Sequence, residues 1–287
     1  MLQFSGALQS SHLLTSRNHL DVYVDSMMKG LERHDAETVG HVDRVAELVC
    51  LLYDEMQNYQ QYQFELMPIS REDLHMGGRL HDVGKTQVPY EILTKPAGLT
   101  DEEFDIIKGH SLDGARMLVK RGMPHVVRNM AQYHHERWDG RGYPNNTSGE
   151  DIPLEARMAA IIDVFDALAS ERSYKAAFPY ERVMQMIAES ANSQFDPHLV
   201  DIFINSYEKF VALHSELQQK QQEQQHVKSN VIPFQNPVND IVHPMIKHLV
   251  SPEELDKITA FPTNEHSYES TYTDNTYDWQ NSTSKYS

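Results

Sequence analysis

The sequence predicts an all-α protein, and three observations support that fold class. Apolar residues recur at helical spacing from about residue 20 to about residue 210. Over that range no segment alternates apolar and polar residues as a half-buried strand does. Serine, threonine and proline residues also stand where helices would begin. We therefore expect a bundle of seven or more helices, with no internal repeat.

The first strongly patterned helices lie before residue 90. The segment ETVGHVDRVAELVCLLYDEM carries one apolar stripe, formed by Val42, Val45, Leu48, Val49 and Leu52. The next helix begins after Ser70, a suitable N-cap with Asp73 three residues later. It leads into the polar motif HDVGK, so we expect the motif to follow the end of a helix.

The later helices are marked by their first and last residues. Thr100 and Glu103 have the spacing of a capping box, and Gly122 ends the helix that they begin. Four further helices are expected to start at prolines, which suit the first turn because they lack an N–H: Pro124, Pro153, Pro179 and Pro197.

The composition changes after about residue 218. A glutamine-rich run, QQKQQEQQHVKSN, is followed by a polar stretch with few aliphatic residues. Such segments bury too little apolar surface to offset the entropy of ordering them. We therefore predict a lead-in segment at 1–30, a helical domain at 31–218 and a low-complexity, mostly disordered tail at 219–287.

The overall composition excludes several classes of protein. The formal net charge of −17 argues against a protein that binds a nucleic-acid polymer through clustered basic residues. No apolar run reaches the roughly 20 residues that span a bilayer, so we expect no membrane insertion. We find no secretory signal, and the single cysteine, Cys50, fits a reducing cytoplasm and excludes a zinc site built on cysteine pairs. A metal would have to be held by histidines and carboxylates.

Histidines and carboxylates recur at positions that suit a metal site. His81 and Asp82 interrupt an apolar helical stretch, as Asp163 does farther along the chain. Burying an unpaired carboxylate costs several kcal/mol, so each needs a partner or a metal. His134 and His135 are adjacent, and adjacent helical residues point about 100° apart, so both can serve only at a helix end or in a large cluster. The candidate ligands are Glu37, His41, His81, Asp82, His110, His134, His135 and Asp163.

Eight ligands are too many for one ion, which suggests two or three ions with Asp82 as the bridge. Imidazole and carboxylate together suit iron, manganese, nickel or zinc. Glu37 precedes His41 by one helical turn, so its carboxylate could hold a further ion. The alternative is that Glu37 only accepts a hydrogen bond from His41 and fixes its tautomer.

Four motifs together resemble the HD-GYP family: HDVGK, the GH of His110, HHERWDGRGYP and DVFDALASERSYKAA. The resemblance extends from about Glu37 to Pro197. This family is a branch of the HD-domain metal-dependent phosphohydrolases, and its members hydrolyse cyclic dinucleotides, mainly cyclic di-GMP. It implies the HD-domain helical bundle with the extra helices of the HD-GYP type, and makes 31–218 the catalytic domain.

The resemblance also implies roles for single residues. The ligands of the basic HD site correspond to His41, His81, Asp82 and Asp163. The additional ligands of a second metal correspond to His110, His134 and His135, and Glu37 matches a carboxylate that helps to hold a third metal in some members. Substrate contacts correspond to Lys85, Tyr143, Arg172 and Lys175.

The implied reaction is hydrolysis of cyclic di-GMP to pGpG and, after further cleavage, GMP. Two or three divalent ions, iron in the first place and manganese in the second, would lower the pKa of a bridging water and generate the attacking hydroxide. Asp82 would bridge the ions, Asp163 would orient the nucleophile, and Lys85 would neutralise charge on the phosphates.

Two alternatives stay open. The chain could hydrolyse another cyclic dinucleotide, such as cyclic GMP–AMP, or it could be a non-catalytic module that senses cyclic dinucleotides. A complete ligand set argues against the sensor, because a sensor does not need a cluster that generates a nucleophile. A protein partner bound through the C-terminal tail and a homodimer are further hypotheses, and we expect a cytoplasmic protein.

Overall fold

The computed structural model describes residues 22–31, 33–34, 40–95, 98–171 and 176–229. Within these ranges every regular element is a helix, apart from one isolated bridge between Ala191 and Phe195. The prediction of an all-α fold is therefore confirmed. Residues 22–31 are helical and come first. The later elements are α2 (His41–Met56), η2 (Gln60–Tyr62), α3 (Gln63–Leu66), α4 (Arg71–Leu80), η3 (Val83–Gln87), α5 (Tyr90–Leu93), α6 (Asp101–Lys120), α7 (His125–Tyr133), η4 (Gly149–Asp151), α8 (Leu154–Ala169), α9 (Tyr180–Glu189), α10 (Pro197–Asn205) and α11 (Tyr207–Ser229).

The helix starts agree with the capping signals in the sequence. Ser70 Oγ accepts a hydrogen bond of 3.0 Å from the Asp73 amide at the start of α4. Thr100 and Glu103 form both hydrogen bonds of a capping box at the start of α6. Pro197 is in the first turn of α10, whereas the other three prolines stand one residue earlier, as N-caps. Their fixed φ suits either position.

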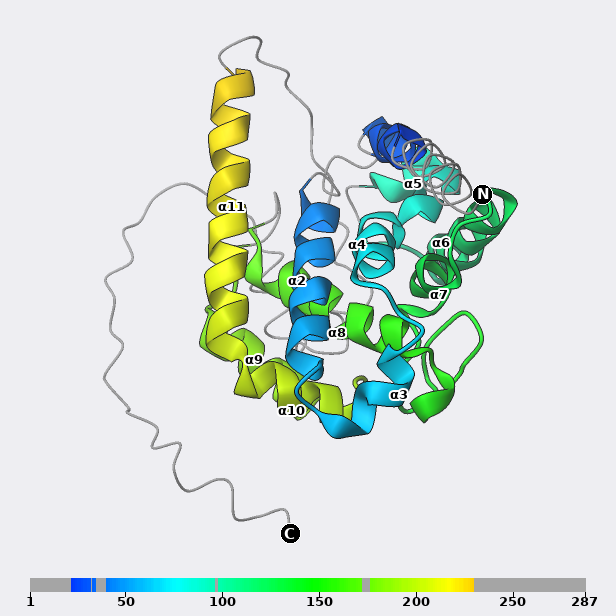
Figure 1. Ribbon diagram of the computed structural model, residues 1–287. Coiled ribbons are helices and arrows are strands. Elements are labelled where there is room, and N and C mark those ends of the chain that lie inside the picture. The colour runs from blue at the N-terminus through cyan, green and yellow to red at the C-terminus, as the bar shows by residue number, and fades with distance from the viewer. Residues whose placement is uncertain (1–21, 32, 35–39, 96–97, 172–175, 230–287) are drawn as a thin grey trace, which may run out of the picture.

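Helix α8 forms the centre of the bundle. All of its residues are buried, and it is surrounded by α2, α7, α9 and α10 (Figure 1). Its sequence, LEARMAAIIDVFDALA, is apolar on nearly every side, which is typical of a helix with no solvent-facing side. Asp163 and Asp166 therefore lie inside the protein core.

The helical residues 22–31 pack onto the bundle beside the elements that carry the HD motif. Val24, Met28 and Leu31 share one apolar cluster with Leu80 of α4 and Val83 of η3. Part of the segment predicted as a lead-in at 1–30 is thus a packed helix, because its apolar residues recur at helical spacing.

Helix α11 continues past the predicted domain boundary. The boundary at 218 lies inside this helix, which packs beside α2 and then continues beyond it to Ser229 (Figure 1). Glutamine and lysine are good helix formers, so a polar run of this composition can extend a helix that the bundle supports at its start. The remainder of the predicted tail, 230–287, lies outside the described residues. Among the described helices, none is both long and apolar enough to cross a membrane.

Candidate metal centre

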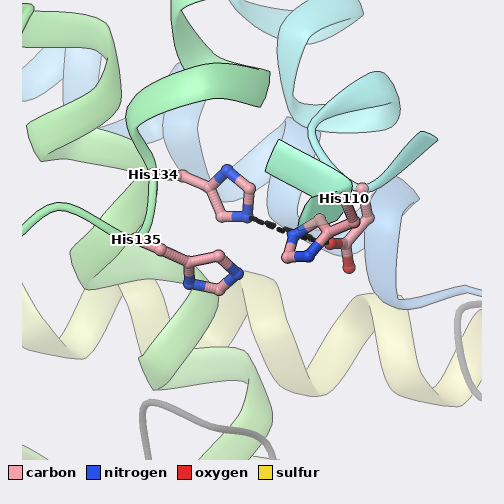
Figure 2. A group of neighbouring side chains, drawn as sticks. His110, His134 and His135 are labelled. Carbon is pink, nitrogen blue, oxygen red and sulfur yellow. Dashed lines mark hydrogen bonds and ion pairs between the residues drawn. The ribbon is translucent and has the colours of Figure 1, made fainter. Parts of the chain in front are cut away.

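The predicted ligands that fall within the described residues converge on one buried space. Ligand atoms within 4.8 Å of one another form two groups that share Asp82. Figure 2 shows the side chains of His110, His134 and His135 turned toward one another. Asp163 completes the set, because its Oδ1 lies 3.2 Å from His41 Nε2. The two groups are Asp82, His110, His134 and His135, and His41, His81 and Asp82.

The HD motif lies at a break between two helices. His81 is the C-cap of α4, and Asp82 is the N-cap of η3. Both side chains are fully buried. The change of helix type lets these neighbours face the same space: His81 Nε2 lies 3.4 Å from Asp82 Oδ2.

Glycines bring η3 against α6, which supplies His110. A Cβ on Gly84 would lie 1.9 Å from the His110 carbonyl oxygen and 2.5 Å from the Gly114 nitrogen. The two backbones therefore touch where a side chain would keep them apart. This contact puts His110 Nε2 3.3 Å from Asp82 Oδ1.

The adjacent histidines are used together because α7 ends at them. Tyr133 is its last residue and His134 is its C-cap, so His135 already belongs to the following turn. Their ring centroids are 3.9 Å apart. The end of α7 therefore explains how two adjacent histidines can point into one site.

The loop after His135 is held by a buried glutamate that sequence reasoning did not identify. Glu136 accepts hydrogen bonds from the backbone amides of Asn145, at 2.6 Å, and Thr147, at 3.1 Å. A Cβ on Gly142 would lie 2.6 Å from the His135 carbonyl oxygen. The GYP segment therefore folds back onto the chain that carries the histidines. A signal in the sequence was the position of Glu136 directly before a turn rich in glycine.

Hydrogen bonds to backbone carbonyls fix the tautomers of three histidines. The Nδ1 atoms of His81, His110 and His134 lie 2.7, 2.6 and 2.9 Å from the carbonyl oxygens of Gly78, Ile107 and Met130. A carbonyl can only accept, so each Nδ1 carries the hydrogen. The Nε2 lone pairs of the neutral rings then face one another and Asp82.

This arrangement fits a cation. His41 Nε2, His81 Nε2 and Asp82 Oδ1 are buried without a hydrogen bond among the described residues, and Asp82 Oδ2 has only the Lys85 ammonium at 2.7 Å as an ion-pair partner outside the imidazole cluster. Buried polar atoms are normally satisfied, and facing lone pairs repel. Imidazole nitrogens and carboxylate oxygens around one space are the donors that divalent transition metals take. The described residues therefore fit a site for divalent metal, as the sequence predicts.

Burial keeps two of the rings neutral. Desolvation lowers the pKa of His110 to about 4 and that of His134 to about 3. Burial also acts to lower the pKa of His81, but the charge and hydrogen bond of Asp82, the charge of Asp163 and the hydrogen bond to the Gly78 carbonyl together outweigh it, and the pKa is raised. Burial would raise the pKa of Asp82, yet Lys85 and His81 hold it well below its usual range.

Asp166 is a further residue of the site that the sequence interpretation missed. Its Oδ2 lies 2.7 Å from His41 Nδ1. The carboxylate can only accept, so His41 donates from Nδ1 and its Nε2 faces Asp163. A carboxylate commonly orients a metal-binding histidine in this way. The signal available was the spacing of Asp163 and Asp166, one helical turn apart in a segment that is otherwise apolar.

Two predicted substrate contacts lie beside this cluster. Lys85 Nζ is 2.7 Å from Asp82 Oδ2, and its side chain is 15% exposed. The ring of Tyr143 packs on His135 at a centroid distance of 4.7 Å. Burial, followed by the charges of Asp82 and Asp163, raises the pKa of Tyr143 well above its usual range. The other predicted residues, Glu37, Arg172 and Lys175, lie outside the described residues.

Comparison with known proteins gives one family. A family model described as HD domain matches residues 38–199. This span contains α2 to α9 and thus every described residue of the candidate centre.

Curated relatives share the same part of the chain. A cyclic di-GMP phosphodiesterase of Vibrio cholerae is 40% identical over 200 residues, which are 67% of this chain and 41% of the relative. A 3'3'-cGAMP-specific phosphodiesterase 2 of the same species is 35% identical, over 68% of this chain and 36% of the relative. A cyclic di-GMP phosphodiesterase of Thermotoga maritima is 35% identical, over 60% and 45%. The chain therefore spans less than half the length of these relatives.

Proposed function

Because the chain belongs to the HD domain family, in its HD-GYP branch, we propose that it is a metal-dependent phosphodiesterase acting on cyclic dinucleotides, with cyclic di-GMP as substrate and pGpG as product. The observation that carries this proposal is the buried set of imidazole Nε2 atoms around Asp82. Facing lone pairs would destabilise a core that serves only the fold, whereas a metal-dependent hydrolase needs them to bind its ions.

The residues that would hold the ions are those that converge in the structure, together with Glu37. Two or three divalent ions, iron or alternatively manganese, would lower the pKa of water and neutralise charge on the phosphodiester. Asp82 lies between the two ligand groups and would bridge them. The proposed ligands are Glu37, His41, His81, Asp82, His110, His134, His135 and Asp163.

Three of the chain's own groups suit the phosphodiester. Lys85 carries a positive charge at the partly exposed edge of the cluster, where it would bind a phosphate oxygen. Tyr143 keeps its hydroxyl proton because of its raised pKa, so it can donate to an oxygen of the substrate. Asp163 would accept a hydrogen bond from the attacking water and orient it. Arg172 and Lys175 would add positive charge along the pocket.

Cyclic GMP–AMP is the second candidate substrate. The relative named as specific for 3'3'-cGAMP matches nearly the same share of this chain as the cyclic di-GMP phosphodiesterase. Both substrates offer the same phosphodiester to the metal centre, and they differ only in one base. A direct comparison of rates is therefore needed.

The test is a hydrolysis assay on anaerobically purified protein supplied with Fe(II) or Mn(II). We expect cyclic di-GMP to be converted to pGpG, with further cleavage to GMP measured in the same chromatograms. Cyclic GMP–AMP in a parallel reaction decides the substrate preference. Binding of either dinucleotide without any hydrolysis by the metal-loaded protein would favour the sensing module instead.

Replacing Lys85 by methionine is expected to lower kcat/KM without loss of metal. The apolar stem is retained while a charged hydrogen bond to the substrate, worth about 1.5–3 kcal/mol, is removed. We expect kcat/KM to fall by roughly 10- to 100-fold. Lys209→Met is the matched control, because Lys209 pairs with Glu55 on the exposed surface. Loss of metal from Lys85→Met would show that Lys85 supports the ligands rather than the substrate.

Replacing Glu37 by glutamine tests the number of ions. If Glu37 is a ligand, the ratio of bound metal to protein is expected to fall from about three to about two, since an amide binds cations more weakly than a carboxylate. Elemental analysis of the anaerobic protein measures this ratio. An unchanged ratio with a modest loss of rate would make Glu37 a hydrogen-bond acceptor for His41 in a two-metal enzyme.

A further inference from the structure

A buried polar network lies on the side of His41 that faces away from the other ligands. Its centre is Asp166 on α8. Asp166 accepts hydrogen bonds from Arg44 Nε at 2.6 Å and from Arg44 Nη2 at 2.9 Å, in addition to its contact with His41. His214 Nε2 lies 3.1 Å from Asp166 Oδ1. His214 belongs to α11, so this helix is linked to the candidate metal centre through Asp166 and His41.

A neutral His214 imidazole gives this network one consistent set of hydrogen-bond directions. Asp166 can only accept, so His214 donates from Nε2 and its Nδ1 accepts from the Tyr180 hydroxyl at 2.9 Å. The Tyr180 oxygen then accepts from Ser215 Oγ at 3.0 Å. The chain of donors runs from Ser215 to Tyr180, His214 and Asp166. Ser170 Oγ also lies 3.2 Å from His214 Nε2, so His214 contacts both Asp166 and the serine that accepts from Arg44.

Because the network is buried, the orientation of the Asp166 carboxylate matters for His41. His214 and Asp166 are fully buried, and Arg44 is nearly so. Inside a protein, water does not compensate a carboxylate that loses a donor, so without His214 the Asp166 Oδ1 atom would be restrained by Arg44 Nε alone. Rotation of Asp166 would change its bond to His41 Nδ1, which fixes the direction of His41 Nε2 toward Asp163.

The helix α11 lies outside the residues that the family model matches, which end at 199. It makes further polar contacts with the same network: Gln221 Oε1 accepts from Arg44, and Gln218 Nε2 lies 3.3 Å from Ser170 Oγ. Ser170 in turn lies 3.1 Å from Arg44 Nη2. The last helix of the bundle is thus joined to the centre by polar contacts as well as by apolar packing.

We propose that His214 on α11 is a positioning residue for the metal centre, acting through Asp166 on His41. The proposal rests on the metal-dependent function proposed above, because it assigns His41 to a metal. Removing the partners of metal-binding histidines typically lowers metal affinity by about 10- to 100-fold. The proposal therefore predicts that a change in α11, two hydrogen bonds away from the ligand His41, weakens metal binding.

The test measures Co(II) affinity and the Co(II) d–d absorption spectrum of the full chain with His214 replaced. His214→Phe keeps a flat ring beside Phe165 but removes every hydrogen bond of the imidazole. We expect its Co(II) affinity to fall by about 10- to 100-fold, with a changed spectrum that reports altered ligand geometry. His214→Gln can still donate to Asp166, so it is expected to restore affinity to within about threefold of the wild type.

The matched control is Phe210→Leu on the same helix. Phe210 is buried against Phe165 and Phe203, so its truncation lowers the melting temperature through packing alone. It should leave Co(II) affinity unchanged. Equal affinities of His214→Phe and the wild type would overturn the proposal, as would an equal loss in Phe210→Leu.

A further variant covers the case in which His214→Phe does not fold. Tyr180→Phe removes only the hydroxyl that His214 accepts from, and we expect a Co(II) affinity about two- to fivefold lower. No loss in that variant would refute the positioning role. These tests measure metal binding and not hydrolysis. A wild type that binds Co(II) but hydrolyses no cyclic dinucleotide would therefore overturn the proposed function. The role of His214 would still be decided by the Co(II) affinities of the variants.

Discussion

Replacing Asp82 by alanine is expected to abolish metal binding and hydrolysis together. Asp82 is shared by both ligand groups, and its oxygens lie 3.3 Å from His110 Nε2 and 3.4 Å from His81 Nε2. Without it, the two ligand groups lose the one carboxylate that they share. We expect kcat/KM to fall by at least about 10³-fold and the metal content to fall below one ion per chain.

The control for Asp82→Ala is Asp113→Ala on α6. Asp113 forms an exposed ion pair with Arg116, so its removal should change neither metal content nor rate. Elemental analysis and the hydrolysis assay on the same samples check both properties. Near-normal turnover with a full metal content in Asp82→Ala would refute the bridging role. A full metal content with no turnover would show that Asp82 orients the reactants and is not needed to bind metal.

Replacing Gly84 by alanine is expected to damage the fold and the metal centre at once. The added Cβ would overlap the His110 carbonyl oxygen and the Gly114 nitrogen, and backbone atoms cannot rotate away as side chains can. Overpacking of this kind costs about 3 kcal/mol, which corresponds to a fall of roughly 6–12 °C in the melting temperature. The displacement of η3 from α6 should also separate Asp82 from His110 and weaken Co(II) binding.

Gly109→Ala on the same helix is the matched control. A Cβ there would meet only Asp113 Oδ2, at 3.9 Å, and alanine favours a helix over glycine. We expect unchanged metal affinity and a melting temperature equal to or slightly above that of the wild type. If Gly84→Ala melted and bound Co(II) like Gly109→Ala, the close approach of η3 and α6 would not be what aligns Asp82 with His110.

The helices were predictable because their signals are local. Caps such as Ser70 and Thr100 act within three residues, and an apolar stripe is visible within one helix. The end of the bundle was less predictable. Gln221 of α11 accepts a hydrogen bond from Arg44, which lies 177 residues earlier in the chain, and composition alone carries no sign of such a contact.

The residues of the candidate site were likewise only partly predictable from the sequence. The ligands in the described residues could be proposed from their motifs, and the structure brings them together without testing whether they bind metal. Asp166 and His214 were not predicted, because a buried aspartate or histidine needs partners that only the fold supplies. Of the partners of Asp166, His214 lies 48 residues away in sequence and Arg44 lies 122 residues away. Glu37, Arg172 and Lys175 remain predictions.

The most direct test of the proposed function is the rate of cyclic di-GMP hydrolysis measured against the number of Mn(II) or Fe(II) ions bound per chain. Metal is added stepwise to metal-free protein under anaerobic conditions, and pGpG is quantified at each step. We predict no product at zero occupancy and a rate that rises to its maximum as two or three ions bind. Full occupancy without hydrolysis of either cyclic di-GMP or cyclic GMP–AMP would contradict the proposed function.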